Sequence, residues 1–254
     1  MIRGLWVYLV GWLATLYFGT DVIVCRALRL RSLTARCWAA QRGWARAVLW
    51  AAGVKVEMSG TENVSTDRAQ VLVANHESWF DVFALAGHLP VGAKFVAKHV
   101  LERVPFFGGA WRACSHISID RGDRTSAIQS LRDVGARIGR TGETVLMFPE
   151  GTRTTTGELQ AFKKGAFVMA LESRVPVVPV GISGSRDLMP KGSFRIRSGT
   201  VRVRIGEAIP VEGMSHEDRD RLTGLARDAV ARLRVAGDIG TVRGEGSRGA
   251  IPSG

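Results

Sequence analysis

The sequence predicts an α/β fold with a mostly parallel central sheet flanked by helices, preceded by an N-terminal membrane-associated helical segment. Two observations predict it. After Gly53, short β-branched runs alternate with longer stretches of helical periodicity. Before Gly53, the chain is apolar and holds one acidic residue, Asp21. The strand candidates are residues 54–58, 70–75, 95–97, 117–119, 144–148, 175–180 and 200–205. The helix candidates are residues 79–88, 124–139, 163–173 and 216–234.

This pattern divides the chain into three parts. We expect residues 1–52 to form membrane-associated helices and residues 53–234 to form the α/β domain. Residues 235–254 are rich in glycine and have little to bury, so we expect a disordered tail. A length of 254 residues and an apolar fraction of 46% are sufficient for one domain with a proper core.

The charge balance predicts an anionic partner. The chain has 35 Lys and Arg against 23 Asp and Glu, a net charge of +12. Nucleic acid, a membrane surface and a phosphorylated substrate would each suit that charge, and charge alone does not choose among them. No recognisable nucleic-acid-binding motif accompanies it, so we do not expect a nucleic-acid partner.

The three cysteines, Cys25, Cys37 and Cys114, are an odd number without close spacing. Such a set predicts neither a disulfide framework nor a zinc site. We therefore expect small buried or lipid-facing apolar side chains in a reducing compartment.

Residues 5–25 predict a retained helix long enough to cross a bilayer. Asp21 is their only charged residue, and the segment would reach about 30 Å as a helix. It has no signal-peptide cleavage site. Four arginines follow between residues 26 and 36, so the positive-inside rule places the rest of the chain on the cytoplasmic face, near anionic lipid. Because Asp21 and two glycines weaken the apolar run, a full span and a shallow re-entrant position both stay open.

Residues 37–54 predict a second helix. Gln41, Arg42 and Arg46 interrupt the stretch, while apolar residues recur along one side at helical spacing. This pattern favours a helix that lies in the membrane interface. The alternative is a helix that packs on the α/β domain.

The segment 75–81 reads Asn-His-Glu-Ser-Trp-Phe-Asp and joins a strand candidate to a helix candidate. Ser78 and Asp81 have the spacing of a capping box, which explains both without any chemistry. It does not explain His76, which stands just outside the helix. If the loop folds back, one ring nitrogen can donate to Asp81 while the other takes a proton from a substrate hydroxyl. We therefore interpret His76 as a general base and Asp81 as its orienting partner.

The segment 148–153 reads Phe-Pro-Glu-Gly-Thr-Arg and leaves another strand candidate. Ligands of parallel sheets usually lie beyond the carboxyl ends of the strands, where both segments fall. A turn with a solvated pair, Glu150 and Arg153, is the alternative interpretation. Arg121 ends a third strand, and two guanidinium groups at one edge suit a phosphate monoester. A base aimed at a hydroxyl of a phosphorylated substrate is the simplest chemistry that uses both segments.

A family resemblance rests on four ordered blocks: residues 75–81, 119–121, 148–153 and 175–180. In these blocks the chain resembles the bacterial 1-acylglycerol-3-phosphate acyltransferases of the glycerolipid acyltransferase superfamily. Stretches between the blocks are also similar, and the resemblance covers roughly residues 50–210. Residues 115–118 depart from it, where the family more often has glycine and larger apolar residues.

The resemblance implies a site and a reaction. The general base is His76, with Asp81 as its partner, and the residues implied to bind the acceptor phosphate are Arg121, Glu150, Gly151, Thr152, Arg153 and Lys98. The implied reaction moves a fatty acyl chain from acyl-CoA or acyl carrier protein to the sn-2 hydroxyl of 1-acyl-sn-glycerol 3-phosphate (lysophosphatidate), giving phosphatidate for phospholipid biosynthesis. The acyl donor is a substrate, so no cofactor and no metal ion are expected. We expect a cell-membrane protein in contact with anionic lipid, with its catalytic domain on the cytoplasmic face.

Two alternatives stay open. The same chemistry could serve another acceptor, such as glycerol 3-phosphate, another lysophospholipid or a lyso-aminolipid. A non-catalytic lipid-binding membrane protein is disfavoured, because His76, Asp81, Glu150 and Arg153 are present together.

Overall fold

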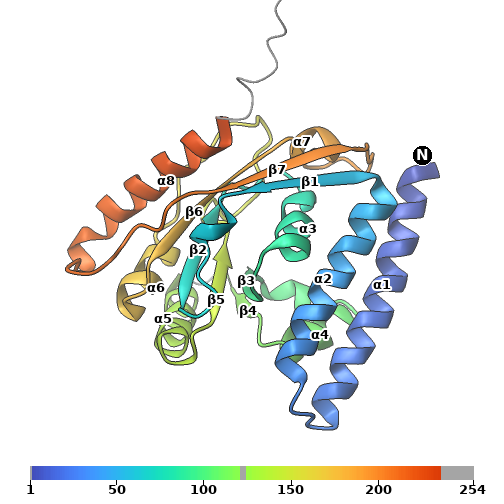
Figure 1. Ribbon diagram of the computed structural model, residues 1–254, viewed down its shortest axis with the longest axis horizontal. Helices are drawn as coiled ribbons and strands as arrows, with labels where there is room; N and C mark the ends of the chain where they lie inside the picture. The colour runs from blue at the N-terminus through green and yellow to red at the C-terminus, as the bar shows by residue number, and fades with distance from the viewer. Residues whose placement is uncertain (1, 121–123, 236–254) are drawn as a thin grey trace, which may run out of the picture.

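The computed structural model describes residues 2–120 and 124–235 and confirms the predicted α/β class (Figure 1). A seven-stranded sheet has the order β1-β7-β6-β2-β5-β3-β4. The strands β6, β2, β5, β3 and β4 are parallel, whereas β1 and β7 pair parallel with each other and antiparallel to β6. The strands are β1 Val54–Ser59, β2 Gln70–Ala74, β3 Ala93–Lys98, β4 Ile117–Ile119, β5 Thr144–Met147, β6 Val177–Ser183 and β7 Gly199–Ile205. Each predicted strand occurs, with bounds that shift by a few residues.

Helices cover both faces of the sheet. The α-helices are α1 Ile2–Ala27, α2 Leu33–Ala52, α3 Trp79–His88, α4 Phe107–Ala113, α5 Arg124–Thr141, α6 Gly165–Ser173, α7 Ser185–Leu188 and α8 Arg219–Val235. Short 3₁₀ helices occupy Thr61–Asn63, His99–Arg103 and His216–Asp218. We did not predict α4, α7 or the first two 3₁₀ helices, because such short elements show no apolar periodicity.

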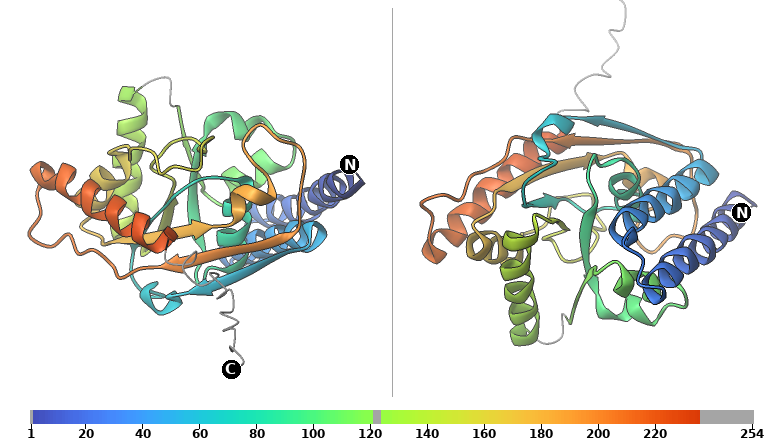
Figure 2. Two further views of the ribbon diagram at one scale, coloured as in Figure 1. Left: turned by 90° about the horizontal axis from the view of Figure 1, so that it is seen from above. Right: turned by 60° about the horizontal axis from the view of Figure 1, so that its bottom comes forward.

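Strand β2 lies in the middle of the sheet, and all five of its residues are buried. Leu72 and Ala74 pack with α2 and α3 on one face, while Val71 and Val73 pack with α5, α6 and α8 on the other. Figure 2 shows the sheet between these two groups of helices. Burial on both faces is typical of parallel strands, and it explains why the strands read as continuous apolar runs.

Helix α1 is long and apolar enough to cross a membrane, and among the described residues it is the one helix that meets this criterion. It packs on α2 and α4 at the outer side of the molecule (Figures 1 and 2), with Trp6, Trp12 and Tyr17 exposed. Asp21 forms an ion pair with Arg36, with Oδ1 and Nη1 2.6 Å apart. An outward apolar face of this extent is typical of a membrane-associated helix.

Helix α2 packs on the α/β domain. This is the alternative that we gave for residues 37–54, beside a helix in the membrane interface. Its residues Ala45, Val48 and Leu49 are buried against α3 and the sheet. Arg46 Nε donates to the carbonyl of Gly87 at 2.9 Å, and Arg42 Nη1 donates to that of Leu89 at 3.2 Å. Cations suit the carboxyl end of a helix, so α2 holds the end of α3 in place.

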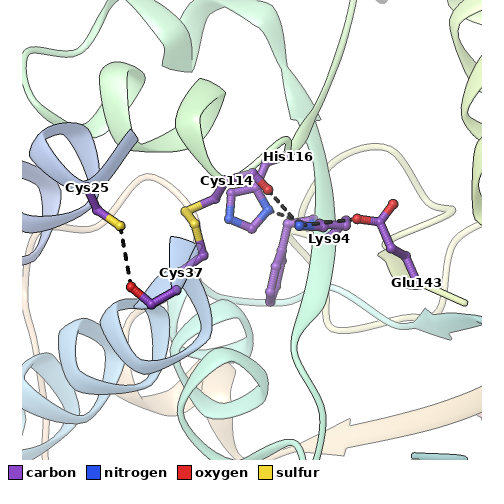
Figure 3. Close-up of a disulfide and its surroundings, with 8 residues drawn as sticks. Cys25, Cys37, Lys94, Cys114, His116 and Glu143 are labelled. Atoms are coloured by element: carbon purple, nitrogen blue, oxygen red, sulfur yellow. Dashed lines mark hydrogen bonds and ion pairs between the residues drawn. A yellow bond between two sulfur atoms is a disulfide. The ribbon is translucent and has the colours of Figure 1, made fainter. Parts of the chain in front are cut away.

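A disulfide joins Cys37 of α2 to Cys114 at the end of α4, with Cα atoms 5.5 Å apart (Figure 3). The expectation of no disulfide is therefore wrong for this pair. The two residues are 77 positions apart, and the packing of a small buried cluster brings them together. No local spacing could reveal such a bond. Cys25 is a buried free thiol, as the sequence led us to expect.

Candidate active site

The segments that follow β2 and β5 meet at the carboxyl edge of the sheet, by which we mean the edge where β2, β5 and β3 end. Because β2 and β5 are adjacent and parallel, residues 75–81 and 148–153 leave the sheet side by side. The His76 ring stacks on Phe148, with ring centroids 4.1 Å apart. The backbone N–H of Thr154 donates to the His76 carbonyl at 3.0 Å. The predicted meeting of the two segments is therefore present in the structure.

The His76 ring and the Asp81 carboxylate are in contact, with Nδ1 and Oδ2 2.9 Å apart. Asp81 is fully buried. Its Oδ2 also accepts the backbone N–H groups of Glu77 and Ser78 at 2.7 and 2.8 Å, so one carboxylate serves both the helix cap and the histidine. A carboxylate at Nδ1 favours the tautomer that carries its proton there. Nε2 is then an acceptor, and the His76 side chain is 15% exposed.

Glu150 and Asn75 fix the loop that carries His76. Glu150 Oε1 accepts the His76 N–H at 2.6 Å, and Oε2 accepts the Gln160 N–H at 3.0 Å. Burial raises the pKa of the Glu150 carboxyl, and these two hydrogen bonds oppose the shift. Asn75 exchanges two hydrogen bonds with the backbone of Ile182 in β6, at 2.9 and 2.7 Å. Glu150 thus joins the two loops internally, a role that the resemblance did not imply.

Arg153 and Lys191 bring positive charge to the carboxyl edge. The Arg153 guanidinium lies over the Trp79 ring, 5.1 Å from its centroid. Partial burial lowers the pKa of Arg153, and the nearby Asp81 opposes that effect. Lys191 Nζ donates to the Thr152 hydroxyl at 3.1 Å and to the Arg153 carbonyl at 2.9 Å. Sequence reasoning missed Lys191, because it stands in a loop outside every recognised block.

The other residues implied to bind phosphate differ in their surroundings. Gly151 has a φ of +73°, a conformation that favours glycine, and the end of the Lys163 side chain lies beside it. Lys163 is therefore another cation near this loop. Lys98 is exposed at the end of β3. Arg121 lies outside the described residues.

Glu77 and Arg234 were also missed by sequence reasoning. Glu77 follows the predicted base, is 6% exposed, and its Oε1 accepts from Arg234 Nε at 2.8 Å. Burial raises the pKa of Glu77 to about 7; Arg234 lowers it, and the carboxylates of Asp81 and Glu150 raise it. Arg234 is 157 residues away in the last turn of α8, so no local pattern connects the pair.

The arrangement combines a proton acceptor, an orienting carboxylate and several cations at one edge. Within residues 2–120 and 124–235, no group of three or more His, Cys, Asp or Glu side chains is placed to hold a metal ion. Such a site can take a proton from a hydroxyl on an anionic substrate.

Comparisons with known proteins point the same way. A sequence profile of the family described as Acyltransferase matches residues 55–183. A Limnanthes alba protein named 1-acyl-sn-glycerol-3-phosphate acyltransferase is 32% identical over 185 residues, which are 73% of this chain and 65% of that protein. A Pseudomonas aeruginosa protein of the same name is 32% identical over 176 residues, 68% of this chain and 67% of that protein. The present chain therefore spans just under two thirds of the plant relative.

A solved structure is similar over most of the chain. The crystal structure of the 1-acyl-sn-glycerophosphate (LPA) acyltransferase PlsC from Thermotoga maritima matches with a TM-score of 0.76 and 25% identity. The match covers 92% of this chain and 96% of that one. Because residues 53–234 are a smaller share of the chain than this, part of the N-terminal helical segment lies within the matched region.

Proposed function

The chain belongs to the acyltransferase family, and we propose that it is a membrane-bound enzyme that acylates the sn-2 hydroxyl of 1-acyl-sn-glycerol 3-phosphate to give phosphatidate. The acyl donor is acyl-CoA or acyl carrier protein. The observation that carries the proposal is the 2.9 Å contact between His76 Nδ1 and Asp81, beside the loop of Arg153. It puts a proton acceptor next to positive charge, which suits a substrate with both a free hydroxyl and a phosphate. The names of the relatives and of the solved structure favour the same acceptor.

In the proposed step, His76 Nε2 accepts the proton of the sn-2 hydroxyl as that oxygen attacks the carbonyl carbon of the thioester. The tetrahedral intermediate collapses by breaking the carbon–sulfur bond. The departing thiolate takes the proton from the imidazolium, which restores neutral His76. Asp81 stabilises the imidazolium between these two events. No covalent acyl-enzyme forms, because the incoming hydroxyl oxygen is itself the nucleophile.

Arg153 is the main contact for the acceptor phosphate in this proposal. Its partial burial over Trp79 supports the assignment, since a partly desolvated guanidinium attracts an anion more strongly than a fully hydrated one. Lys191 joins the contacts implied by the resemblance, which are Lys98, Arg121, Gly151 and Thr152. Glu150 acts indirectly, because both of its oxygens already accept backbone N–H groups.

Helix α1 holds the enzyme at the membrane, with residues 53–234 as the catalytic domain on the cytoplasmic face. The exposed aromatic and apolar residues of α1 support this placement, as does the arginine cluster at residues 26–36. An acceptor that carries an acyl chain is itself dissolved in the bilayer. The activated thioester supplies the reactive carbonyl group, so the proposed reaction needs no cofactor.

The test is acyl transfer by purified protein in mixed micelles, with lysophosphatidate as acceptor. Labelled acyl-CoA and labelled acyl carrier protein are supplied in parallel, with His76→Ala protein as the control. We expect labelled phosphatidate from the wild type with at least one donor. A panel that includes glycerol 3-phosphate and other lysophospholipids tests the acceptor. Product from one of those acceptors alone would move the assignment to it, and binding without any transfer would indicate a non-catalytic lipid-binding protein.

A further inference from the structure

Three buried carboxylates lie in and around the loop that carries His76: those of Glu77, Asp81 and Glu150, which are 6%, 0% and 4% exposed. They come from the loop after β2, the first turn of α3 and the loop after β5. Burial penalises each charge, and like charges at close range raise the cost further. Backbone N–H groups bind both oxygens of Glu150 and Oδ2 of Asp81. Glu77 instead forms an ion pair with the guanidinium of Arg234.

Arg234 contacts two different loops of the carboxyl edge. Its Nε donates to Glu77 Oε1 at 2.8 Å, in the loop of the base. Its Nη2 donates to the carbonyl of Gly157, in the loop that begins with Glu150 and Arg153. The guanidinium is therefore a bridge between the two segments that the reaction needs.

The packing of α8 on β6 sets the position of this guanidinium. A Cβ at Gly181 of β6 would come within 2.5 Å of the backbone nitrogen of Arg234, so a glycine is required for the close approach of strand and helix. Arg204 Nη1 of β7 donates to the carbonyl of Leu233 at 3.4 Å, which holds the last turn of α8. The side chain of Arg234 is 23% exposed and points toward the loops rather than away from them.

We propose that Arg234 is a positioning residue for acyl transfer, because its guanidinium holds the loop of His76 against the loop of Glu150 and Arg153. The rate effect rests on the proposed function. Arg234 lies outside residues 55–183, the segment that the family profile matches. It touches neither reacting group in this proposal and acts through Glu77 and Gly157.

The charged groups around Glu77 predict the effect of removing Arg234. Glu77 faces Asp81 from α3, Glu150 from the loop after β5 and Arg234 from α8, and His76 precedes it in the chain. Burial already raises the pKa of Glu77 to about 7 and raises that of Glu150, while Arg234 lowers both. Without Arg234, both carboxyl groups would bind protons at a higher pH. A protonated Glu150 would accept the His76 N–H less well, so the loop of the base would lose its support.

The experiment compares Arg234→Gln with Arg232→Gln, an exposed arginine in the same helical turn. We expect Arg234→Gln to lower kcat by about 10- to 100-fold, the cost of a small misplacement of reacting groups. The acidic limb of its pH–rate profile should move to higher pH, and the acceptor KM should change less than kcat. Arg232→Gln should resemble the wild type. A wild-type kcat and an unshifted pH profile in Arg234→Gln would overturn the proposal.

A double-mutant cycle with Glu77→Gln tests whether the pair acts as a unit. Glu77→Gln removes the buried charge, so adding Arg234→Gln to it should cost little further activity. Additive losses would contradict the pairing. If Arg234→Gln alone does not fold, a folded and active double variant supports the proposal, whereas an unfolded one shows that Arg234 serves the fold independently of Glu77 and overturns it.

Thermal unfolding of the wild type, the two single variants of the cycle and the double variant distinguishes a failure of the proposed function from a failure of the Glu77–Arg234 pairing. If the wild type transfers no acyl group to any acceptor, the proposed function fails. The melting temperatures still decide the pairing, since a coupled pair gives a double variant more stable than the sum of the single losses predicts. If the wild type is active and the effects of Glu77→Gln and Arg234→Gln are additive, the positioning role of Arg234 is wrong and the proposed function still holds.

Discussion

His76 and His116 are both partly buried, lie at opposite edges of one sheet, and have very different partners. His76 follows β2 and contacts the Asp81 carboxylate. His116 precedes β4 and lies near Lys94 and Cys114 (Figure 3). Its Nδ1 accepts the Phe95 N–H at 3.1 Å, and its ring packs on Trp111. Burial, together with the Lys94 cation, lowers the pKa of His116 to about 3, so this ring is neutral near pH 7. The comparison teaches that the carboxylate partner, rather than burial, distinguishes the candidate base.

The two edges also use their cations differently. At the amino edge, where β3 and β5 begin, Lys94 Nζ donates to the Cys114 carbonyl at 2.8 Å and lies 3.4 Å from Glu143. At the carboxyl edge, the Arg153 guanidinium rests on an aromatic ring, where an anion can reach it. Changes at the carboxyl edge should therefore alter the rate of acyl transfer, while changes at the amino edge should alter stability.

The largest effect is expected for His76→Ala. Loss of a general base typically costs about 10²- to 10⁴-fold, so turnover with lysophosphatidate should fall at least a hundredfold. Circular dichroism and vesicle flotation should show an intact fold and unchanged membrane binding. The matched change at the other edge, His116→Asn, should leave turnover near that of the wild type. If the two variants lost activity equally, the contrast between the edges would fail.

Arg153→Ala should have the next largest effect and should act on acceptor binding. A hydrogen bond to a charged group is worth about 1.5 to 3 kcal/mol, which corresponds to a rise of about tenfold or more in the acceptor KM. The KM for the acyl donor should change little. Initial rates over a range of lysophosphatidate concentrations measure both constants, and an unchanged acceptor dependence would remove Arg153 from phosphate recognition.

His116 should affect the pH dependence of stability more than the rate. Its folded-state pKa of about 3 lies below the ordinary value of 6.5, so the unfolded chain binds the proton first as the pH falls. The free energy of unfolding should therefore decrease below about pH 6.5, by up to about 1.4 kcal/mol per pH unit from this group. Urea unfolding between pH 7 and pH 4 measures this slope. His116→Asn, which cannot titrate, should show a shallower slope, and an identical slope would contradict the assignment.

The smallest effect on rate is expected for Cys37→Ser with Cys114→Ser. A bond that closes a loop of 77 residues should contribute about 2 to 4 kcal/mol to stability when it is oxidised. If the domain lies on the cytoplasmic face, as we propose, its thiols are kept reduced, and the oxidised form belongs to protein handled without reductant. Alkylation with mass spectrometry reports the thiols, and unfolding with and without reductant reports the stability. Equal stability of wild type and variant without reductant would mean that the bond does not form in solution.

Much of the fold could be predicted because its signals are local. Continuous β-branched runs identify β2 and β5, and Ser78 identifies the start of α3. The contact between His76 and Asp81 could also be predicted, because the carboxylate of the capping box lies within reach of a loop that folds back on the start of the helix. These predictions depend on residues a few positions apart.

The rest of the site depends on residues that are distant in the sequence. Glu77 meets Arg234 across 157 positions because α8 packs on the sheet, and Cys37 meets Cys114 across 77 positions because α2 packs beside α4. Glu150 was assigned to the ligand from a resemblance, and its hydrogen bonds to two backbone N–H groups become apparent only in three dimensions. Lys191 comes from an irregular loop with no pattern of its own.

The bond between Cys37 and Cys114 makes the oxidised chain a closed ring with two tails. His76 and Asp81 belong to the ring, whereas Glu150, Arg153 and Arg234 belong to the C-terminal tail. A single protease cut in the exposed turn at residues 104–106 would therefore leave one covalent molecule. Adding dithiothreitol would release two fragments, with His76 on one piece and Glu150, Arg153 and Arg234 on the other.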